Sequence, residues 1–384
     1  MENWQVGGFG LYVHWPFCQS KCPYCDFNSH VSASIDQQAW ADAYLNELDR
    51  YAAETPDRYL SSIYFGGGTP SLMNPSTIGA ILDRAAHHWA FANDIEITLE
   101  ANPGSIEARN FAGYRDAGVN RVSIGIQALN DMDLKRLGRL HSVNEAKQAL
   151  TLARSLFDRV SFDLIYARQD QSLGDWNAEL EMALEFDPDH LSLYQLTIEP
   201  GTAFGARFDA GKLKGLPDED IATDMYFMTQ SMCEAAGLPA YEVSNHARSG
   251  QESQHNLIYW SSGDWIGIGP GAHGRLTLDG QRFATETRLL PSDWLDDVAQ
   301  GRGEHQRTVI PIGEQATEYL LMGLRMSSGI DLQRLKNQYS TSLSANKIKE
   351  LSDLELVEQS GSNLRATAAG RPVLNGILRE LAPD

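Results

Sequence analysis

Six short, apolar, β-branched runs alternate with helical patterns over the first half of this 384-residue chain, and this alternation strongly limits its fold. The runs predict strands over Leu11–Trp15, Ser62–Phe65, Ile95–Glu100, Arg121–Ile126, Val160–Ile165 and His190–Leu196. The stretches between them predict helices over Gln37–Ala53, Pro75–Ala90, Ile106–Ala117, Asn144–Leu156 and Trp176–Glu185. Such alternation is typical of βα units around a parallel sheet. Six units are too few for a closed eight-stranded barrel, so we expect an α/β fold, either a partial six-unit barrel or an open wound sheet.

Both folds place function at the carboxyl ends of the parallel strands. Chemistry-capable residues follow several of the predicted strands, namely Cys18, Gly66–Thr69, Glu100, Gln127 and Asp163. The sequence therefore predicts one functional edge.

The alternation of predicted strands and helices ends after Leu196. A helix is predicted over Asp218–Ala236, and the histidine- and glycine-containing stretch Tyr241–Gly274 is predicted to be an irregular surface. From residue 311 onward, helical patterns and a short hairpin resemble a winged-helix module, which we interpret as a packing domain. We expect three parts: a barrel over 1–200, a connecting region over 201–310 and a carboxy-terminal helical domain over 311–384.

Composition excludes several classes of protein. Hydrophobic residues make up 42% and charged residues 21%, as in a globular chain. Lysine plus arginine number 31 against 51 aspartate plus glutamate, a net charge of −20, which disfavours nucleic acid and anionic lipid. Met1–Gly8 does not read as a signal peptide, and no apolar run is long enough to span a membrane. We expect a cytoplasmic protein with no integral membrane segment.

Three of the four cysteines, Cys18, Cys22 and Cys25, form a C-x3-C-x2-C motif. Three thiolates on a short loop can hold three irons of a cubane cluster and leave the fourth iron open to an amino-carboxylate ligand. A structural zinc site is the alternative, with His14 or His30 as the fourth ligand. The fourth cysteine, Cys233, lies in a helical pattern and is expected to be a buried apolar residue.

Cys18, Cys22, Tyr24 and Cys25 match the radical S-adenosylmethionine (SAM) signature, and the surrounding chain resembles the oxygen-independent coproporphyrinogen oxidase family. The matching segments are Tyr12–Cys18, Gly66–Pro70, Glu100–Pro103, Gly125–Gln127 and Phe162–Tyr166. The resemblance implies a partial (β/α)6 barrel with a carboxy-terminal accessory domain. It also implies a [4Fe-4S] cluster on Cys18, Cys22 and Cys25, and bound SAM.

The resemblance implies SAM contacts from Tyr12, Tyr24, Gly67, Gly68, Thr69, Glu100, Gln127, Arg139 and Asp163. The two glycines would let the backbone approach the amino-carboxylate of the ligand, and Thr69 adds a hydroxyl. Glu100 and Asp163 end buried strands, so each needs a partner. That partner is either a SAM ribose hydroxyl or ammonium group, or a salt bridge to Arg121 or Arg139. The family commonly has Gly-Leu-Pro where this chain has Ala167–Gln169, which affects the expected shape of that loop.

Two functions are compatible with the resemblance: oxidative decarboxylation of coproporphyrinogen III, and haem delivery by the haem-chaperone branch of the family. Phe27 stands where the oxidase has a fourth cysteine, and Cys18 lies closer to the start of the chain than in the oxidase. His255–Trp260 matches the HNxxYW motif of the chaperones. All three features favour the chaperone, while the question of enzymatic activity stays open. The resemblance implies haem as cargo, recipient apo-haemoproteins of the respiratory b type, and an unidentified electron donor.

His255 is the predicted axial haem ligand, because a neutral imidazole ligates haem iron and Tyr259 and Trp260 offer aromatic faces. Asn256 would orient the ring. We expect His255 to lie in an exposed loop from which haem can be released. His246 and His273 are the weaker candidates. The glycine-rich segment Gly267–Gly274 lacks the βαβ context of a dinucleotide site, so we interpret it as a tight loop near the haem or adenosyl site.

Overall fold

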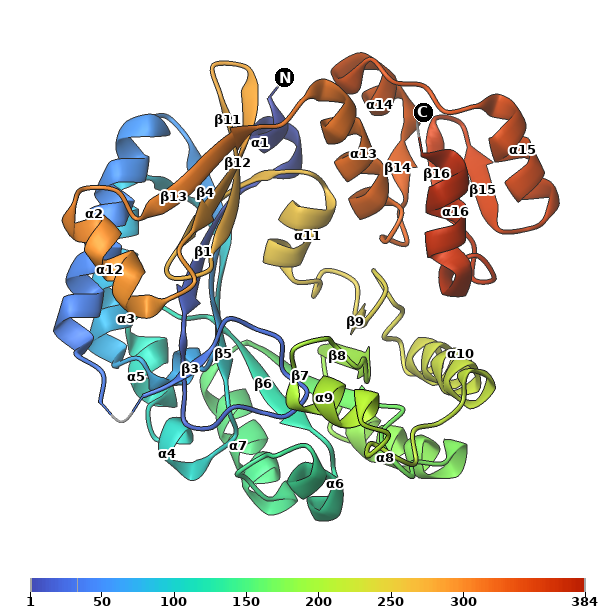
Figure 1. Ribbon diagram of the computed structural model, residues 1–384, viewed down its shortest axis with the longest axis horizontal. Helices are drawn as coiled ribbons and strands as arrows, with labels where there is room; N and C mark the ends of the chain where they lie inside the picture. Colours follow the sequence, from blue (N-terminus) through green and yellow to red (C-terminus); the bar gives the residue numbers. More distant parts are fainter. Residues whose placement is uncertain (1, 33, 383–384) are drawn as a thin grey trace.

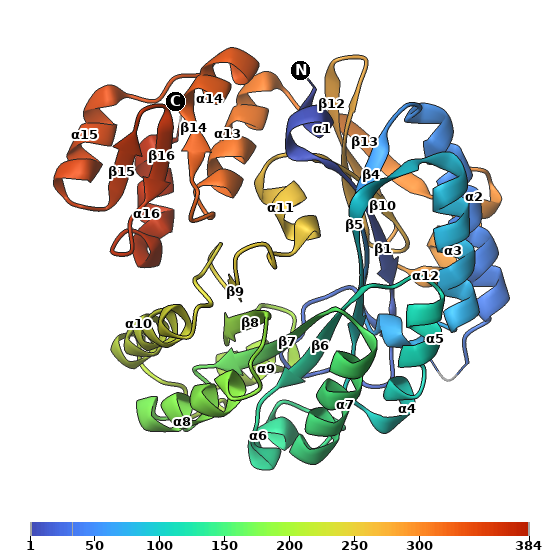
Figure 2. The same ribbon diagram turned by 180° about the vertical axis from the view of Figure 1, so that it is seen from behind.

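The computed structural model describes residues 2–32 and 34–382, and Figures 1 and 2 show it from opposite sides. Met1, Ala33 and residues 383–384 lie outside the described residues. The first residue of the expected barrel and the last two residues of the expected carboxy-terminal domain are therefore not described. One curved sheet of eleven strands dominates the fold, with the order β13-β12-β11-β10-β1-β4-β5-β6-β7-β8-β9. Its concave side faces helix α11 and the carboxy-terminal domain (Figure 1).

All six expected strands are present in the middle of this sheet. They are β1 (Phe9–Trp15), β4 (Tyr59–Gly67), β5 (Ala90–Ala101), β6 (Arg121–Gln127), β7 (Arg159–Tyr166) and β8 (His190–Gln195). They pair in parallel and in chain order. An open wound sheet would reverse its strand order at a switch point. The chain-order pairing therefore identifies the partial barrel, which does not close, because β13 and β9 form its two edges.

Helices cover the outer face of the barrel (Figures 1 and 2). They are α2 (Gln37–Glu54), α3 (Pro75–His88), α4 (Ser105–Ala108), α5 (Phe111–Asp116), α6 (Asp131–Arg136), α7 (Val143–Leu156) and α8 (Leu173–Leu184). The expected helix over Ile106–Ala117 is thus interrupted between α4 and α5. Alternating apolar residues of the strands and one face of each helix build the core between the layers, which includes Leu11, Ile63, Leu99, Val122 and Phe162.

The connecting region extends the same sheet. It contributes β9 (Asn245–Ala247), β10 (Asp264–Ile268), β11 (His273–Leu278), β12 (Gln281–Thr287) and β13 (Glu304–Val309). β10 is fully buried and pairs in parallel with β1. The expectation of an irregular surface over Tyr241–Gly274 is therefore wrong. Its strands are too short to give a local signal, and pairing with distant strands stabilises them. The expected boundary at residue 200 stays a prediction.

The remaining elements of the barrel and the connecting region are helices and two-residue strands. They are α1 (Asn3–Gly7), β2 (Phe17–Cys18), β3 (His30–Val31), α9 (Ala203–Asp209), α10 (Glu219–Ala235), α11 (Gln254–Trp260) and α12 (Pro291–Ala299), with a 3-10 turn over Pro70–Leu72. The expected helix over Asp218–Ala236 is α10, which Asp218 caps through a bond from the Ile221 amide. Cys233 on this helix is buried in the core, as expected.

The carboxy-terminal domain has its own core and a three-stranded sheet of order β14-β16-β15. Its elements are α13 (Ile312–Gly323), β14 (Ile330–Asp331), α14 (Leu332–Tyr339), α15 (Ala345–Asp353), β15 (Val357–Ser360), β16 (Asn363–Ala366), a 3-10 turn over Arg371–Val373 and α16 (Leu374–Leu381). Helices followed by a hairpin match the winged-helix-like expectation.

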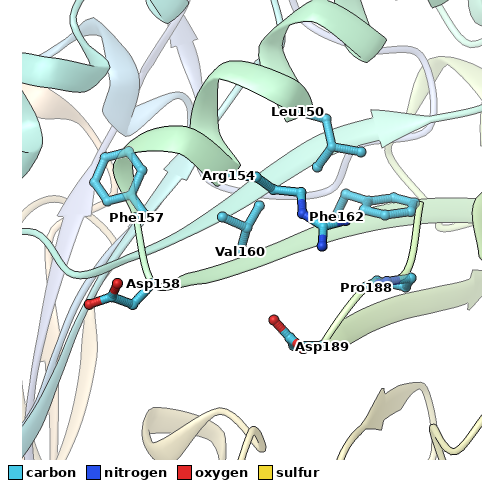
Figure 3. A pocket seen from close by; sticks show the side chains of 8 residues that line it. All are labelled: Leu150, Arg154, Phe157, Asp158, Val160, Phe162, Pro188 and Asp189. Carbon is cyan, nitrogen blue, oxygen red and sulfur yellow. The ribbon is translucent and has the colours of Figure 1, made fainter.

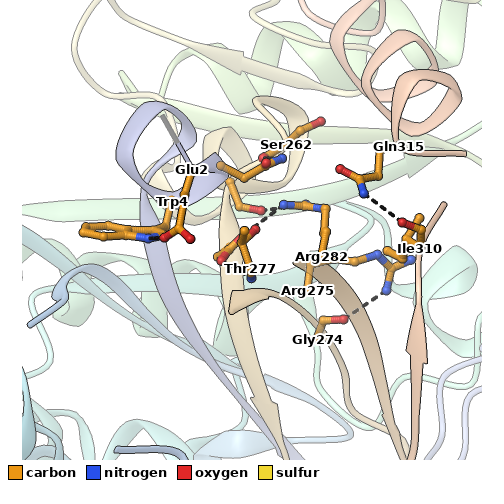
Figure 4. Close-up of polar contacts among 12 residues, drawn as sticks. Glu2, Trp4, Ser262, Gly274, Arg275, Thr277, Arg282, Ile310 and Gln315 are labelled. Atoms are coloured by element: carbon orange, nitrogen blue, oxygen red, sulfur yellow. Dashed lines mark hydrogen bonds and ion pairs between the residues drawn. The ribbon is translucent and has the colours of Figure 1, made fainter. Parts of the chain in front are cut away.

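Polar contacts join this domain to the barrel where β11, β12 and α13 meet (Figure 4). Gln315 Nε2 donates to the Ile310 carbonyl at 2.8 Å, and Arg275 forms an ion pair with Glu318 at 2.9 Å. Arg282 donates to Asp264 and to the Gly263 carbonyl at the base of β10. In the part of the chain that the structure describes, no helix is long and apolar enough to cross a bilayer.

Candidate cluster and cofactor site

The three motif cysteines lie on a loop that leaves the carboxyl end of β1. Their thiols are free and half-buried. Thr69 Oγ1 donates to Cys18 Sγ at 3.4 Å, and Arg139 Nη1 donates to Cys22 Sγ at 3.5 Å. Burial raises the pKa of the Cys18 and Cys25 thiols. Half-buried sulfurs with hydrogen-bond donors aimed at them are a donor set that fits an iron–sulfur cluster.

The two histidines of the zinc alternative are occupied by other contacts. His14 Nδ1 lies 3.0 Å from Tyr12 Oη and His14 Nε2 lies 2.9 Å from the Asn28 carbonyl, while His30 Nε2 lies 3.2 Å from Asn28 Oδ1. Among the described residues, no three His, Cys, Asp or Glu side chains are grouped to hold a single metal ion. In a cubane each thiolate takes a different iron, so the cluster does not need the single-ion grouping that zinc requires.

Gly67 and Gly68, at the end of β4, pack against the base of the cysteine loop. Gly67 has φ +110°, and a Cβ there would lie 2.6 Å from the His14 ring. A Cβ on Gly68 would lie 2.7 Å from the Phe17 carbonyl oxygen. Neighbouring protein atoms therefore leave no room for a side chain at either glycine. The expected approach of a ligand to their backbone stays a prediction.

Arg139 links the cysteine loop to the ends of β5 and β6. Its Nη2 donates to Asn102 Oδ1 at 2.6 Å and to the Gly125 carbonyl at 2.7 Å. Its buried Nε has no partner among the described residues. Gln127, at φ +75°, sits where the β6–β7 register shifts, a bulge that re-aims a side chain. An unpaired guanidinium N–H beside the thiols fits an anionic ligand such as the carboxylate of SAM.

Asn102 is a further residue of this rim that our sequence analysis did not assign. Besides accepting from Arg139, it donates from Nδ2 to Thr69 Oγ1 at 3.3 Å. The sequence feature that could have identified Asn102 is its position in the matched segment Glu100–Pro103. Tyr24 also belongs to the rim and packs against Phe204 of α9, with ring centroids 6.5 Å apart.

Below the rim, the barrel encloses a polar cavity of about 290 Å³. Four of the predicted site residues line it: Tyr12, Glu100, Asp163 and His255. The others, which sequence reasoning did not assign to the cavity, are Tyr64, Arg121, Ser123, His190, Ser192, Tyr194, Asn245, Ser253, Asn256 and Tyr259. Several face one another across neighbouring strands, as Tyr12 does Tyr64. A polar residue at an inward position of a buried strand was the available signal.

The two strand-end carboxylates find neutral partners. Glu100 accepts from Tyr64 Oη at 2.8 Å and from the Gly67 amide at 3.2 Å, and Asp163 accepts from Ser123 Oγ at 3.2 Å. Burial raises the pKa of Glu100 to about 7 and that of Asp163 to about 6.

The alternative partner, a salt bridge to Arg121 or Arg139, does not form for either carboxylate in the described chain. Arg121 lies 3.7 Å from Glu96, and Arg139 bonds the rim residues instead. Buried carboxylates without a protein cation suit a ligand that brings an ammonium group or hydroxyls.

His255 is buried, so the expectation of an exposed loop is wrong. Only 1% of the residue is exposed. Its Nδ1 lies 3.0 Å from Ser62 Oγ and its Nε2 lies 2.7 Å from Tyr259 Oη, and burial lowers its pKa to about 3. The motif forms α11, and positions four apart share one helix face. His255 and Tyr259 therefore both enter the barrel. Haem ligation by His255 stays a prediction, and it requires α11 to open.

The other two histidines differ sharply in exposure. His246 is buried in β9, and burial lowers its pKa to about 4. The side chain of His273, the first residue of β11, is 60% exposed. The glycine-rich loop before His273 packs against the cysteine loop, because Asn28 Nδ2 donates to the Pro270 carbonyl at 2.9 Å.

A second cavity, of about 280 Å³, lies on the outer face of the barrel (Figure 3). It is lined by side chains at the amino ends of β7 and β8, including Arg154, Asp158 and Asp189. This edge is opposite the cysteines, and residues at the amino ends of barrel strands serve stability rather than chemistry.

The in-order parallel sheet, the cysteine loop and the polar rim define a radical SAM protein. Residues 12–183 match the model of the Radical SAM superfamily, and residues 313–373 match that of the HemN C-terminal domain. Coproporphyrinogen III oxidase (HemN) of Escherichia coli has the same fold, with a TM-score of 0.81 over 97% of this chain and 90% of that chain at 23% identity.

Relatives with higher identity narrow the class. The heme chaperone HemW of Escherichia coli is 41% identical over 319 residues, which is 82% of this chain and 82% of HemW. Radical S-adenosyl methionine domain-containing protein 1, mitochondrial, of Bos taurus is 38% identical over 384 residues, which is 97% of this chain and 86% of the relative. The chain belongs to the HemW-type family of radical SAM proteins.

Proposed function

We propose that this protein is a haem chaperone, which binds haem and transfers it to apo-haemoproteins of the respiratory b type. The geometric observation that carries the proposal is the filled barrel. Helix α11 occupies the interior, and the remaining cavity of about 290 Å³ is at or below the roughly 300–1,000 Å³ of ordinary ligand pockets. A cavity of this volume leaves little room for a porphyrinogen substrate beside SAM, which supports the proposal. The similarity to the heme chaperone HemW agrees with this reading.

The residues at the rim fit the two cofactors that the family implies. Cys18, Cys22 and Cys25 would hold the [4Fe-4S] cluster. Tyr12, Tyr24, Gly67, Gly68, Thr69, Glu100, Gln127, Arg139 and Asp163 would surround SAM. The cluster, when bound there, would supply an electron for chemistry on SAM. Arg139 would orient the carboxylate end of SAM, while Glu100 and Asp163 would accept hydrogen bonds from its donors.

The free thiols of the chain also suggest its cellular compartment. Free thiols are maintained in reducing compartments, so we propose the cytoplasm, with an electron donor that remains to be identified. The three-part division at residues 200 and 310 is part of the same proposal, with 313–373 as the HemN C-terminal module.

Coproporphyrinogen III oxidase is the alternative, and one assay separates the two functions. Anaerobically reconstituted protein should bind about one haem per chain, as a single-site carrier does, and should leave coproporphyrinogen III unconsumed. The reason is that Phe27 stands where the oxidase has cysteine, and α11 fills the barrel. Absorbance titration measures haem, and chromatography of the porphyrins measures turnover. Sustained formation of protoporphyrinogen would contradict the proposal.

A further inference from the structure

Four large apolar side chains are exposed beside the cysteine loop. Phe27 is 57% exposed, Val31 60%, Leu289 62% and Leu290 53%. Asn28 holds the two segments together, because its Nδ2 donates to the Leu289 carbonyl at 2.8 Å. We call this surface the cysteine-loop patch. Isolated exposed apolar residues are ordinary, but a group of large ones gathered from two segments marks an interaction site.

An exposed imidazole stands in the glycine-rich segment that borders the patch. His273 follows Gly271, whose amide donates to the carbonyl of Arg288 at 2.8 Å, directly before Leu289. Its Nδ1 lies 4.0 Å from the Glu286 carboxylate. Its Nε2 has no hydrogen-bond partner within the described chain. An exposed imidazole with a free ring nitrogen can ligate a metal.

Two cations flank the patch in a chain of net charge −20. Lys21 is exposed, and its Nζ lies 3.5 Å from the Ser29 carbonyl. The Arg288 side chain is 43% exposed, and its Nε donates to Asp297 at 3.2 Å. Asp26 is exposed next to Phe27, and its negative charge partly offsets these two positive charges. These groups complement haem. Its flat apolar face would contact the apolar side chains, its two carboxylates would lie near the two cations, and its iron could be ligated by the free imidazole.

We propose that haem docks on the cysteine-loop patch, with His273 as its axial ligand and with Lys21 and Arg288 near its propionates. This rests on the proposed chaperone function and specifies where it takes place. The cargo would lie outside the barrel, next to the candidate cluster, on a surface from which it can leave without unfolding α11. Phe27 then has a role of its own as part of the haem-binding surface.

The test is a haem titration of the reconstituted full-length chain and its variants. His273→Gly should weaken haem binding about tenfold or more and shift the Soret band. Added imidazole should restore the band, because it supplies the missing ligand. Leu289→Ser with Leu290→Ser should weaken binding by a similar factor, since it removes apolar contact area, without changing the axial ligation seen by electron paramagnetic resonance.

The controls separate this inference from the chaperone function itself. His87→Ala, which changes an exposed histidine on α3, should keep haem affinity within about twofold, the range of an uninvolved surface change. If the parent binds haem and His273→Gly binds it with an unchanged spectrum, the inference is wrong. A lost spectrum in His255→Ala alone would place the ligand inside the barrel. A parent that binds no haem would remove the proposed function as well.

Discussion

Iron should be lost completely from Cys18→Ala, Cys22→Ala and Cys25→Ala proteins. Anaerobic reconstitution of the parent should give about four irons per chain, the stoichiometry of a cubane with three protein thiolates. Each variant removes one of only three anchors, and two thiolates on one flexible loop do not retain the cluster. Iron and sulfide analysis, with the visible charge-transfer bands, measures the loss.

Cys233→Ala is the matched control. This thiol is buried in the core on α10, away from the cysteine loop, so its removal should leave the iron content unchanged. A parent that instead holds one tightly bound zinc, lost in the same three variants, would revive the zinc alternative. The contacts of His14 and His30 make that outcome unexpected, because both histidines already bond within the loop region.

The parallel strands could be predicted from sequence because each is a continuous run of apolar residues that needs burial on both faces. β10 has the same burial but only five residues, and its partners β1 and β11 lie on opposite sides of it in the sheet. No local pattern reports such pairing. The edge strands of the sheet could not be predicted either, because they depend on how far the sheet extends beyond the six βα units.

The candidate site was predictable where it lies at strand ends. Glu100 lies next to the end of β5 and Asp163 lies in the second half of β7, so the alternation of strands and helices already places both toward one edge. Arg139 follows a loop after α6, and only the family resemblance pointed to it. The prediction that His255 lies in an exposed loop was wrong for a different reason, because no pattern in the sequence indicated that Gln254–Trp260 forms a helix. Here Ser62 and Tyr259 satisfy both of its ring nitrogens, which makes its burial tolerable.

SAM binding should weaken roughly 10- to 100-fold in Glu100→Gln, because a hydrogen bond to a charged group contributes about 1.5–3 kcal/mol. The loss follows whether the carboxylate accepts from the ammonium group or from the ribose hydroxyls. Isothermal titration with SAM measures it. Glu181→Gln, an exposed substitution on the outer face of α8, is the matched control and should bind as the parent does.

The pH dependence provides a second readout for the same residue. Since burial raises the pKa of Glu100 to about 7, the carboxylate is lost as pH falls below 7, and SAM affinity of the parent should fall with it. The unliganded fold should respond in the opposite direction. Its native state binds a proton that the unfolded chain releases between pH 4.5 and 7, so stability relative to Glu100→Gln should rise as pH falls through that range. Flat profiles for both quantities would mean that Glu100 stays charged and has a partner other than SAM.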